Sequence, residues 1–522
     1  MSKVKFISAQ DAAVMIPDGA CVGTCGFLLT CTAEEILQEI EKRFLQTGKP
    51  QALSLMWAAG IGEGGTAKGL NHLSYAGLLK KTVGGHYGLI KKMIPLITEN
   101  QIEAYNFPQG VISQMFREMA AKKPGVLTHV GLGTFVDPEF GGGKLNNQAT
   151  EDIVTKMNLD GTDYLFYKSQ QIDIAILRGT ESDENGNISF RREALTLEAL
   201  AVAMAAKNNG GKVFVQVEKK VKNGTIDPKN VIIPGILVDF VVIVADEKNH
   251  MQTAAIQFNE ELISNRAVLE QPARDFPLDE RKIIARRAAL EIENTDHVLN
   301  FGIGLPEGVA DILKEEGITE YFTASVEPGL IGGVALGGLN FGSALAPEAI
   351  IDEPYQFDFY DGGGIDVTFL GMAQCDCEGN LNASKFGSRI AGCGGFIDIS
   401  QNAKKSIFCG TFTAGGLKTN VNEGKLQIAN EGREKKFVQC VEHLTFNGTY
   451  ERLKNKRILI ITERAVFELK ATGLTLIEIA PGIDLEKDVL AHMSFKPVIA
   501  ENLKIMDSII FYDKPMGLIN NY

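Results

Sequence analysis

Positive charge is in short supply along this chain of 522 residues. Lys and Arg number 52 against 65 Asp and Glu, so the formal net charge is −13 at pH 7. Nonspecific nucleic-acid binding needs a basic surface, and we therefore expect no nucleic-acid partner. The balance still permits a local basic pocket for an anionic ligand.

Long apolar runs and a secretory signal are also missing. The first residues, Met1-Ser-Lys-Val-Lys5, contain no apolar signal region. The longest apolar run, residues 231–245, is interrupted by Pro234, Gly235 and Asp239 and is too short to span a bilayer. We therefore expect a cytoplasmic protein without a membrane contact.

Cysteine and histidine offer little for metal binding or disulfides. Eight cysteines spread over the chain do not make a disulfide scaffold. Neither Cys375-Asp-Cys377 nor the group Cys21, Cys25 and Cys31 has zinc spacing, and no HExxH occurs. We expect no metal.

Nucleotide-binding fingerprints are absent too. No GxxxxGK[ST] occurs, and residues 302–308, Gly-Ile-Gly-Leu-Pro-Glu-Gly, do not form a GxGxxG. A P-loop and a dinucleotide fold of the usual kind are therefore not predicted.

Glycine, by contrast, is abundant at 55 residues, and it recurs between apolar strands and helices. Residues 20–30 predict a buried strand and a turn, and Thr32-Ala-Glu-Glu35 matches a capping box before a helix from Glu34 to Phe44. Further strands at 173–177 and 212–217, with a helix from 195 to 207, continue the alternation. This pattern indicates an α/β fold with a largely parallel sheet.

The chain contains an internal repeat. Asp173, Asp183 and Gly186-Asn187 align with Asp366, Asp376 and Gly379-Asn380 at a shift of 366 − 173 = 193 residues. Chance similarity of one short window is the alternative, because such turns are common. We predict two similar open α/β domains fused in one chain: residues 1–250, a linker or crossover over 251–280, and residues 281–522. The loop at Pro108-Gln-Gly110 is a possible counterpart of Glu327-Pro-Gly329.

One acidic residue stands out at a predicted strand end. The segment Thr323-Ala-Ser-Val-Glu327-Pro-Gly-Leu-Ile-Gly-Gly333 is a short apolar strand that ends on Glu327 and then enters glycine. Pro328 favours an extended backbone at Glu327, and the glycines leave little bulk near its carboxylate. A carboxylate so placed can act as a nucleophile. A strand-terminal Glu in a solvated turn is the simpler alternative.

Several glycine loops are candidate ligand sites, because ligands of open α/β sheets bind beyond the carboxyl ends of the strands. Gly-rich loops are often only turns, but their number predicts an extended ligand held by backbone amides. The candidate binding residues are Gly302, Ile303, Gly304, Gly362, Gly363, Gly364, Gly394 and Gly395.

Together these motifs resemble the class I coenzyme A transferases, and within them the single-chain acetate/propionate CoA-transferases with fused α and β subunits. The resemblance covers nearly the whole chain. Its strongest stretches are Asn106-Phe-Pro-Gln-Gly110, Gly131-Leu-Gly-Thr-Phe-Val-Asp-Pro138 with Gly141-Gly-Gly-Lys-Leu145, Ser325-Val-Glu-Pro-Gly-Leu-Ile-Gly-Gly333, Gln356-Phe-Asp-Phe-Tyr-Asp-Gly-Gly-Gly364, Gly392-Cys-Gly-Gly-Phe-Ile-Asp398 and Ile461-Thr-Glu-Arg-Ala-Val-Phe467.

The resemblance implies roles for particular residues. Glu327 corresponds to the glutamate that carries the acyl and CoA groups, and Gly394-Gly395 to the glycines of the oxyanion and CoA pocket. Asn106 and Gln109 correspond to a loop that reaches the site, although alone they are more often turn formers. Pro328 departs from the family, in which Ser, Asn or Thr often follows the glutamate.

We therefore expect a CoA-transferase that moves CoA from a short-chain acyl-CoA to acetate, propionate, lactate or butyrate through covalent intermediates on Glu327. CoA is a co-substrate, and no tightly bound cofactor is expected. The family implies a homodimer or homotetramer. An acyl-CoA thioester hydrolase and a non-catalytic CoA- or ligand-sensing protein of the same fold are the alternatives.

Overall fold

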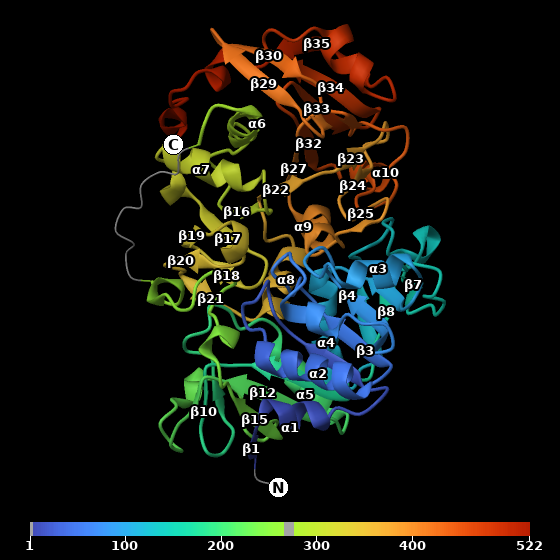
Figure 1. Ribbon diagram of the computed structural model, residues 1–522. Coiled ribbons are helices and arrows are strands. Elements are labelled where there is room, and N and C mark those ends of the chain that lie inside the picture. Colours follow the sequence, from blue (N-terminus) through green and yellow to red (C-terminus); the bar gives the residue numbers. More distant parts are fainter. Residues whose placement is uncertain (1–3, 266–275) are drawn as a thin grey trace. The chain divides into compact units, whose positions relative to one another are not determined.

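The chain forms two compact units, whose elements are labelled in Figure 1. A computed structural model describes residues 4–265 and 276–522. Unit 1 consists of the described parts of Met1–Ala267 with Val326–Phe359 and Gly387–Asp398. Unit 2 consists of the described parts of Val268–Ser325 with Tyr360–Phe386 and Ile399–Tyr522.

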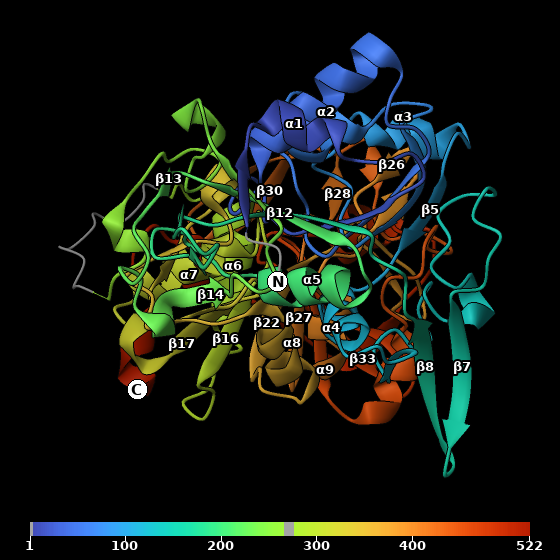
Figure 2. The same cartoon turned by 90° about the horizontal axis from the view of Figure 1, so that it is seen from below.

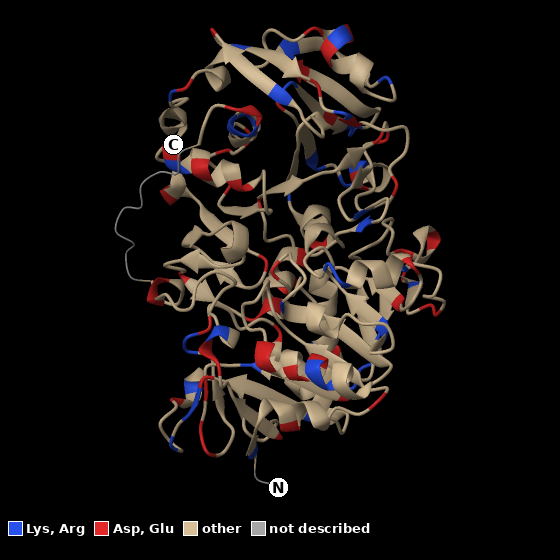
Figure 3. Ribbon diagram, in the orientation of Figure 1, with Lys and Arg blue, Asp and Glu red and all other residues tan. Residues whose placement is uncertain are grey.

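Part of the predicted linker, residues 266–275, lies outside the described residues, and the predicted domain boundaries stay a prediction. Among the described residues, no helix combines the length and apolar character needed to cross a bilayer. Figure 3 shows Lys and Arg interspersed with Asp and Glu along the ribbons of both units, so the net negative charge is spread along the chain.

An eight-stranded parallel sheet forms the centre of unit 1. Its central strands are apolar on both faces, as in the buried run Val213-Phe-Val-Gln-Val217, because helices cover both sides. In spatial order the strands are β1 (Lys5–Ile7), β15 (Phe240–Ile243), β12 (Lys212–Val217), β9 (Ile174–Arg178), β2 (Cys21–Thr24), β3 (Leu53–Trp57), β4 (Leu79–Gly84) and β5 (Glu103–Asn106).

Figure 2 shows helices on opposite sides of this sheet, with α1, α2 and α3 on one side and α4 and α5 on the other. The first group encloses the main hydrophobic cluster of the unit, which includes Ile36, Trp57 and Ile97. The helices are α1 (Ala9–Val14), α2 (Glu34–Thr47), α3 (Met93–Thr98), α4 (Gln109–Ala120) and α5 (Ala199–Asn208).

The predicted capping box at Thr32 is wrong. Helix α2 begins after Ala33, which makes no side-chain cap. The Gln216 side-chain oxygen on β12 accepts hydrogen bonds from the Glu35 N–H at 3.0 Å and the Ile36 N–H at 3.4 Å instead. A side chain distant in sequence thus satisfies the first turn of the helix.

Shorter strands complete unit 1. An antiparallel sheet contains β6 (Gly125–Thr128), β8 (Thr162–Lys168) and β7 (Val154–Leu159), and a second small sheet contains β13 (Lys219–Lys220), β10 (Glu181–Ser182), β11 (Ile188–Ser189) and β14 (Val231–Ile233). Two antiparallel pairs follow Glu327: β18 (Leu330–Ile331) with β21 (Ala349–Ile350), and β19 (Val334–Ala335) with β20 (Ala344–Leu345). Strand β26 (Arg389–Ile390) precedes the glycine loop at 391–395.

A second, mostly parallel sheet forms the centre of unit 2. Its parallel strands are, in spatial order, β17 (Thr323–Val326), β16 (Val298–Phe301), β22 (Val367–Gly371), β27 (Lys405–Cys409) and β32 (Arg457–Ile461). Strands β33 (Ala465–Lys470) and β34 (Gly473–Ile479) continue antiparallel, and β35 (Val498–Ile505) pairs parallel with β34. The α/β fold with two largely parallel sheets is therefore confirmed.

The remaining elements of unit 2 are short. Its helices are α6 (Glu280–Ala289), α7 (Glu307–Glu315) and α10 (Gly448–Glu451), while α8 (Glu353–Asp361) and α9 (Phe396–Asn402) begin in unit 1 and end in unit 2. Its remaining strands are β23 (Gln374–Cys375), β24 (Leu381–Asn382), β25 (Lys385–Phe386), β28 (Thr413–Ala414), β29 (Lys418–Asn422), β30 (Lys425–Asn430) and β31 (Glu434–Lys435).

The internal repeat is confirmed by two turns that make the same hydrogen bonds. The Asp183 carboxylate accepts from the Asn187 N–H and the Asn187 side-chain amide, at 2.9 and 2.8 Å. The Asp376 carboxylate accepts from the same two groups of Asn380, at 3.1 Å each. Each turn follows a central parallel strand, β9 or β22, so the two units repeat one plan.

The suggested pairing of the 108–110 loop with Glu327 is wrong. The repeat equates β9 with β22, and the sheet orders then equate β2 with β16 and β3 with β17. Glu327 follows β17, so its counterpart in unit 1 is the loop after β3 rather than the loop after β5.

Candidate functional site

A glycine loop at 391–395 is fixed on the strand-end loops of β4 and β5, and all of these segments belong to unit 1. The Gly394 N–H donates to the Gly85 carbonyl at 2.8 Å, and the Gly394 carbonyl accepts from the Gln109 N–H at 2.9 Å. Gly394 has φ +51°, a left-handed conformation that favours glycine. The loop therefore lies at the carboxyl ends of the parallel strands, where ligands of such sheets bind.

Asn106, the last residue of β5, joins three strand-end segments through its side chain. Its Nδ2 donates to the carbonyls of Gly84 and Gly85 at 2.8 and 2.7 Å, and its Oδ1 accepts from the Cys393 N–H at 2.9 Å. The side chain is fully buried. Both N–H groups of the amide are thus engaged with the protein, and Asn106 holds the glycine loop in place.

Gly395 differs from its neighbour in hydrogen bonding. The Gly394 N–H is bonded to Gly85, whereas the Gly395 N–H has no backbone partner among the residues that the structure describes. Of the two predicted oxyanion donors, Gly395 is therefore the one whose N–H is not already bonded to another backbone group.

Glu327 lies in a tight turn at the end of β17. The Gly329 N–H donates to the Val326 carbonyl at 3.1 Å, and the Gly329 carbonyl accepts from the Ile351 N–H at 2.8 Å. Gly329 has φ +112°, and a Cβ there would overlap the Ile351 carbonyl oxygen. Pro328 occupies the third position of this turn and has no N–H, so it offers no backbone donor to the Glu327 carboxylate.

The same hairpin brings a second carboxyl group toward the site. Strand β18 after Glu327 pairs with β21, which leads directly into Glu353 at the start of α8. Glu353 is fully buried, and its Oε1 accepts a hydrogen bond from Gln109 Nε2 at 3.0 Å. Gln109 therefore links Glu353 to the glycine loop, because its backbone N–H binds Gly394.

Electrostatics set these carboxyl groups apart from ordinary surface acids. Burial raises the pKa of Glu327 to about 7, with its own backbone N–H acting in the opposite direction. Burial also raises the pKa of Glu198 to about 7. Burial, followed by the Glu198 charge, holds the pKa of Glu353 well above its usual range, and the Glu327 charge raises it further. Glu353, beside Gln109, is thus the carboxyl group whose pKa responds to both of the others.

Sequence reasoning missed Glu353, Glu198 and His86. His86 lies in the loop after β4, and its Cδ2 would be 3.8 Å from a Cβ at Gly394. Burial lowers the pKa of His86 to about 4, so it is neutral at pH 7. None of the three lies in a distinctive motif, because their contacts join segments far apart in the sequence.

The other predicted binding glycines lie in unit 2. The Gly304 N–H donates to Glu307 Oε1 at 2.8 Å, and the Gly363 N–H donates to the Tyr360 carbonyl at 2.9 Å. These amides are engaged in local turns, and the assignment of residues 302–304 and 362–364 to CoA stays a prediction.

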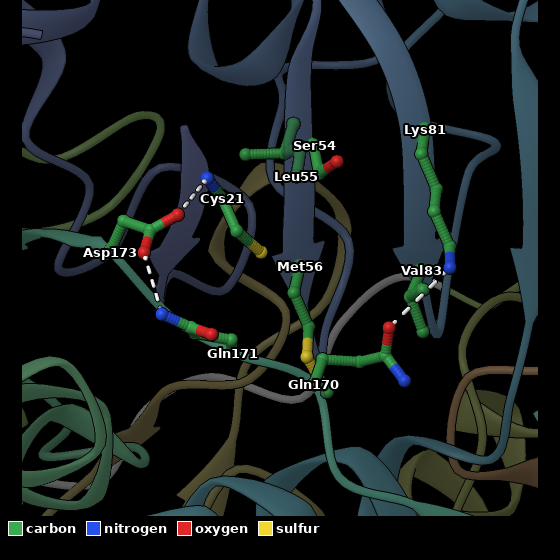
Figure 4. Close-up of a pocket in the computed structure, with 9 residues that line it drawn as sticks. All are labelled: Cys21, Ser54, Leu55, Met56, Lys81, Val83, Gln170, Gln171 and Asp173. Carbon is green, nitrogen blue, oxygen red and sulfur yellow. Dashed lines mark hydrogen bonds between the residues drawn. The ribbon is translucent and has the colours of Figure 1, made fainter. Parts of the chain in front are cut away.

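A separate cavity of about 310 Å³ lies at the opposite ends of the unit 1 strands. Figure 4 shows its lining, in which Cys21, Ser54 and Lys81 come from the beginnings of β2, β3 and β4. Asp173 accepts from the Cys21 N–H at 2.9 Å and from the Gln171 side-chain amide at 3.4 Å. Because the glycine loop lies at the carboxyl ends of the same strands, this cavity is not part of the candidate site.

Comparison with known proteins identifies the chemistry of related chains. A family model described as "Coenzyme A transferase" matches residues 6–243. Caffeate CoA-transferase of Acetobacterium woodii is 45% identical over 519 residues, with 98% of each chain covered. Acetate CoA-transferase YdiF of Escherichia coli K12 is 43% identical over 521 residues, covering 99% of this chain and 97% of YdiF.

A crystal structure of the acyl-CoA transferase YdiF from Escherichia coli O157:H7, described as a thioester complex with CoA, has the same fold. The TM-score is 0.92 at 42% identity, and the match covers 99% of this chain and 97% of YdiF.

Proposed function

Because this chain belongs to the coenzyme A transferase family and is a CoA-transferase, we propose that Glu327 carries the CoA from a short-chain acyl-CoA to a free carboxylate. The observation that carries the proposal is the turn at Val326–Gly329. It presents a half-buried carboxyl group with a pKa of about 7 in the unit that also holds the glycine loop. A desolvated carboxylate next to a bound thioester is a nucleophile at high effective concentration.

The first half-reaction has two steps. A Glu327 oxygen attacks the thioester carbonyl carbon, the C–S bond breaks, and an acyl-glutamyl anhydride and CoA thiolate result. The thiolate then attacks the Glu327 carbonyl carbon, the C–O bond of the anhydride breaks, and the first carboxylate leaves. Glu327 then holds CoA as a thioester, and the acceptor carboxylate repeats these steps in reverse order.

Each attack creates a tetrahedral oxyanion that needs preorganised donors. We assign the Gly395 N–H to this task, because the Gly394 N–H is bonded to Gly85. Asn106 acts by holding the loop, since both its side-chain N–H groups are engaged. Gln109 anchors the same loop from α4 and has its amide next to Glu353.

The acid specificity is proposed as short-chain monocarboxylic, such as acetate, propionate, lactate or butyrate. The acids in the names of the two relatives, acetate and caffeate, differ widely in size. An aromatic acid therefore belongs in the same assay panel. Transient attachment of CoA to Glu327, a cytoplasmic location and a homodimer or homotetramer are part of the proposal.

Trapping the intermediate tests the role of Glu327. Incubation with acyl-CoA followed by borohydride should inactivate the enzyme and modify only the peptide that contains Glu327. Glu327→Gln should lose transfer by at least about 1,000-fold, as expected for loss of a covalent nucleophile. Glu348→Gln, an exposed carboxylate of the same hairpin, is the matched control and should keep both activity and labelling.

Two results would contradict the proposal. One is a Glu327→Gln enzyme that transfers CoA within tenfold of the wild-type rate. The other is a borohydride-modified peptide elsewhere in the chain. The rate is also measured with and without acceptor acid, because a thioester hydrolase would release CoA at the same rate in both cases.

A further inference from the structure

We propose that Glu198 and Glu353 form a carboxyl pair that shares one proton and, through Gln109, positions the glycine loop of the transferase site. The two side chains come from separate segments of unit 1, the start of α5 and the start of α8. Their importance for the reaction depends on the proposed role of Glu327, whereas the shared proton is a property of the pair itself.

Unsatisfied oxygen atoms are the first observation behind the pair. Glu198 is 2% exposed and Glu353 is 0% exposed. Gln109 satisfies one Glu353 oxygen, but Glu353 Oε2 and both Glu198 oxygens have no well-formed hydrogen bond to any donor among the described residues. A buried acceptor without a donor is costly. The Glu198 and Ala58 N–H groups lower the pKa of Glu198 without making a well-formed hydrogen bond to it, and one proton between the two carboxyl groups supplies a well-placed donor.

A backbone hydrogen bond joins the two segments that carry these acids. The Leu197 carbonyl accepts from the Glu353 N–H at 3.1 Å, and Leu197 has φ +53°, an uncommon conformation for a residue with a side chain. Glu198 stands at the N-cap of α5 but makes no side-chain cap, because its carboxyl group is directed to Glu353 instead.

The charged neighbourhood favours a single negative charge on the pair. The titratable groups around the pair are Glu327, Asp352 and the buried Cys25 thiol. Burial raises the pKa of Cys25, and the charges of Glu198 and Glu353 raise it further. The hydrogen bond between the two carboxyl groups raises the pKa of Glu353 and lowers that of Glu198. The proton therefore belongs mainly to Glu353, which donates to the Glu198 carboxylate, and the pair titrates as one coupled unit.

This arrangement fixes the direction of the Gln109 amide. A protonated Glu353 donates through Oε2 and accepts through Oε1, so Gln109 must present its N–H side to Glu353. A neutral Glu353 also avoids placing a further negative charge beside Glu327, which must be ionised to attack. Loss of the shared proton would leave the first effect unchanged, because a carboxylate also accepts from the Gln109 N–H, but it would place a further negative charge beside Glu327.

Replacement by an amide and by an apolar residue separates this role from simple packing. Gln at position 353 keeps a donor for Glu198 and an acceptor for Gln109 but cannot lose a proton. Glu353→Leu should lower kcat/KM about 10- to 100-fold, the range expected for leaving buried partners unsatisfied. Glu353→Gln should lose less, and the fall of kcat/KM at alkaline pH in the wild type should be absent. Glu118→Gln near the end of α4, where the carboxylate pairs with the exposed Lys123, is the control without effect.

Infrared spectroscopy tests the proton directly. Wild type at pH 7 should show the carbonyl stretch of a protonated carboxylic acid, and both Glu353→Gln and Glu198→Gln should remove or shift it. The band should persist in Glu327→Gln, so failure of the trapping experiment leaves this result intact. The proposal is overturned if wild type lacks the band, or if Glu353→Gln loses as much activity as Glu353→Leu with an unchanged alkaline limb.

Discussion

Replacing Asn106 by Leu should separate the holding of the glycine loop from general stability. The substitution keeps the side-chain size but removes the hydrogen bonds to Gly84, Gly85 and Cys393, which measure 2.8, 2.7 and 2.9 Å. The side chain is fully buried, so water cannot replace them. The two carbonyls and the Cys393 N–H are then left without this partner.

The magnitude follows from these three bonds. Each contributes about 1 kcal/mol net, and a buried group left unsatisfied costs about 1–3 kcal/mol. With partial relaxation, we expect the free energy of unfolding to fall by about 3–5 kcal/mol. We also expect kcat to fall about 100-fold, because a shift of about 1 Å in the loop misplaces the Gly395 N–H.

Asn146 provides a matched control within the same unit. Its Nδ2 also donates to two carbonyls, those of Ile97 and Ile102 at 2.9 and 2.8 Å, and its Oδ1 accepts from the Ala149 N–H at 3.3 Å. Asn146→Leu should lose stability in urea unfolding yet keep kcat within about threefold of wild type. If Asn106→Leu retains kcat as well as Asn146→Leu does, Asn106 has no special part in holding the site.

Three further predictions concern pH and the Glu327 turn. With a Glu327 pKa of about 7, kcat/KM should rise as pH increases through 7. Pro328→Ser adds a backbone N–H donor next to Glu327 and should move this acidic limb of the pH profile to lower pH. An unchanged limb in the variant would contradict this role of Pro328. Gly329→Ala should lower transfer at least about tenfold, because φ is +112° and the Ile351 carbonyl blocks a Cβ; steady-state kinetics on the folded variant measure this. Burial lowers the pKa of His250 to about 4, so below about pH 6.5 the unfolded chain binds a proton that the folded chain does not, and the free energy of unfolding should fall between about pH 6.5 and 4. In His250→Asn this fall should be smaller by about 2 kcal/mol. Urea titrations of both proteins at pH 7 and 4.5 measure the difference.

Local chemistry explains what could be predicted without the structure. Asp183 and Asp376 accept from amides only a few residues away, so the repeat was visible as a short sequence pattern. The turn after Glu327 likewise depends on neighbours, since Pro328 limits the preceding backbone and Gly329 supplies a positive φ. The family and the place of Glu327 in it follow from such stretches.

Partners far apart in sequence could not be predicted in the same way. Thr32 fits a capping box by spacing, yet Gln216, 181 residues from Glu35, caps the helix. Gln109 and Glu353 are 244 residues apart, and the sequence around neither residue predicts that the other is its partner. Amide side chains bond whichever carbonyl or carboxyl group folding places beside them.

The sequence by itself determined two α/β sheets of similar plan, the family, and a glutamate between a strand and glycines. The tertiary structure decided which segments form a compact unit, because residues 326–359 and 387–398 join the first unit rather than their sequence neighbours. It also decided which glycine amide has a backbone partner and which carboxyl groups meet. Burial and hydrogen bonding depend on the folded surroundings of a residue. A backbone hydrogen bond distinguishes Gly394 from Gly395, and complete burial distinguishes Glu353 from most other acids of the chain.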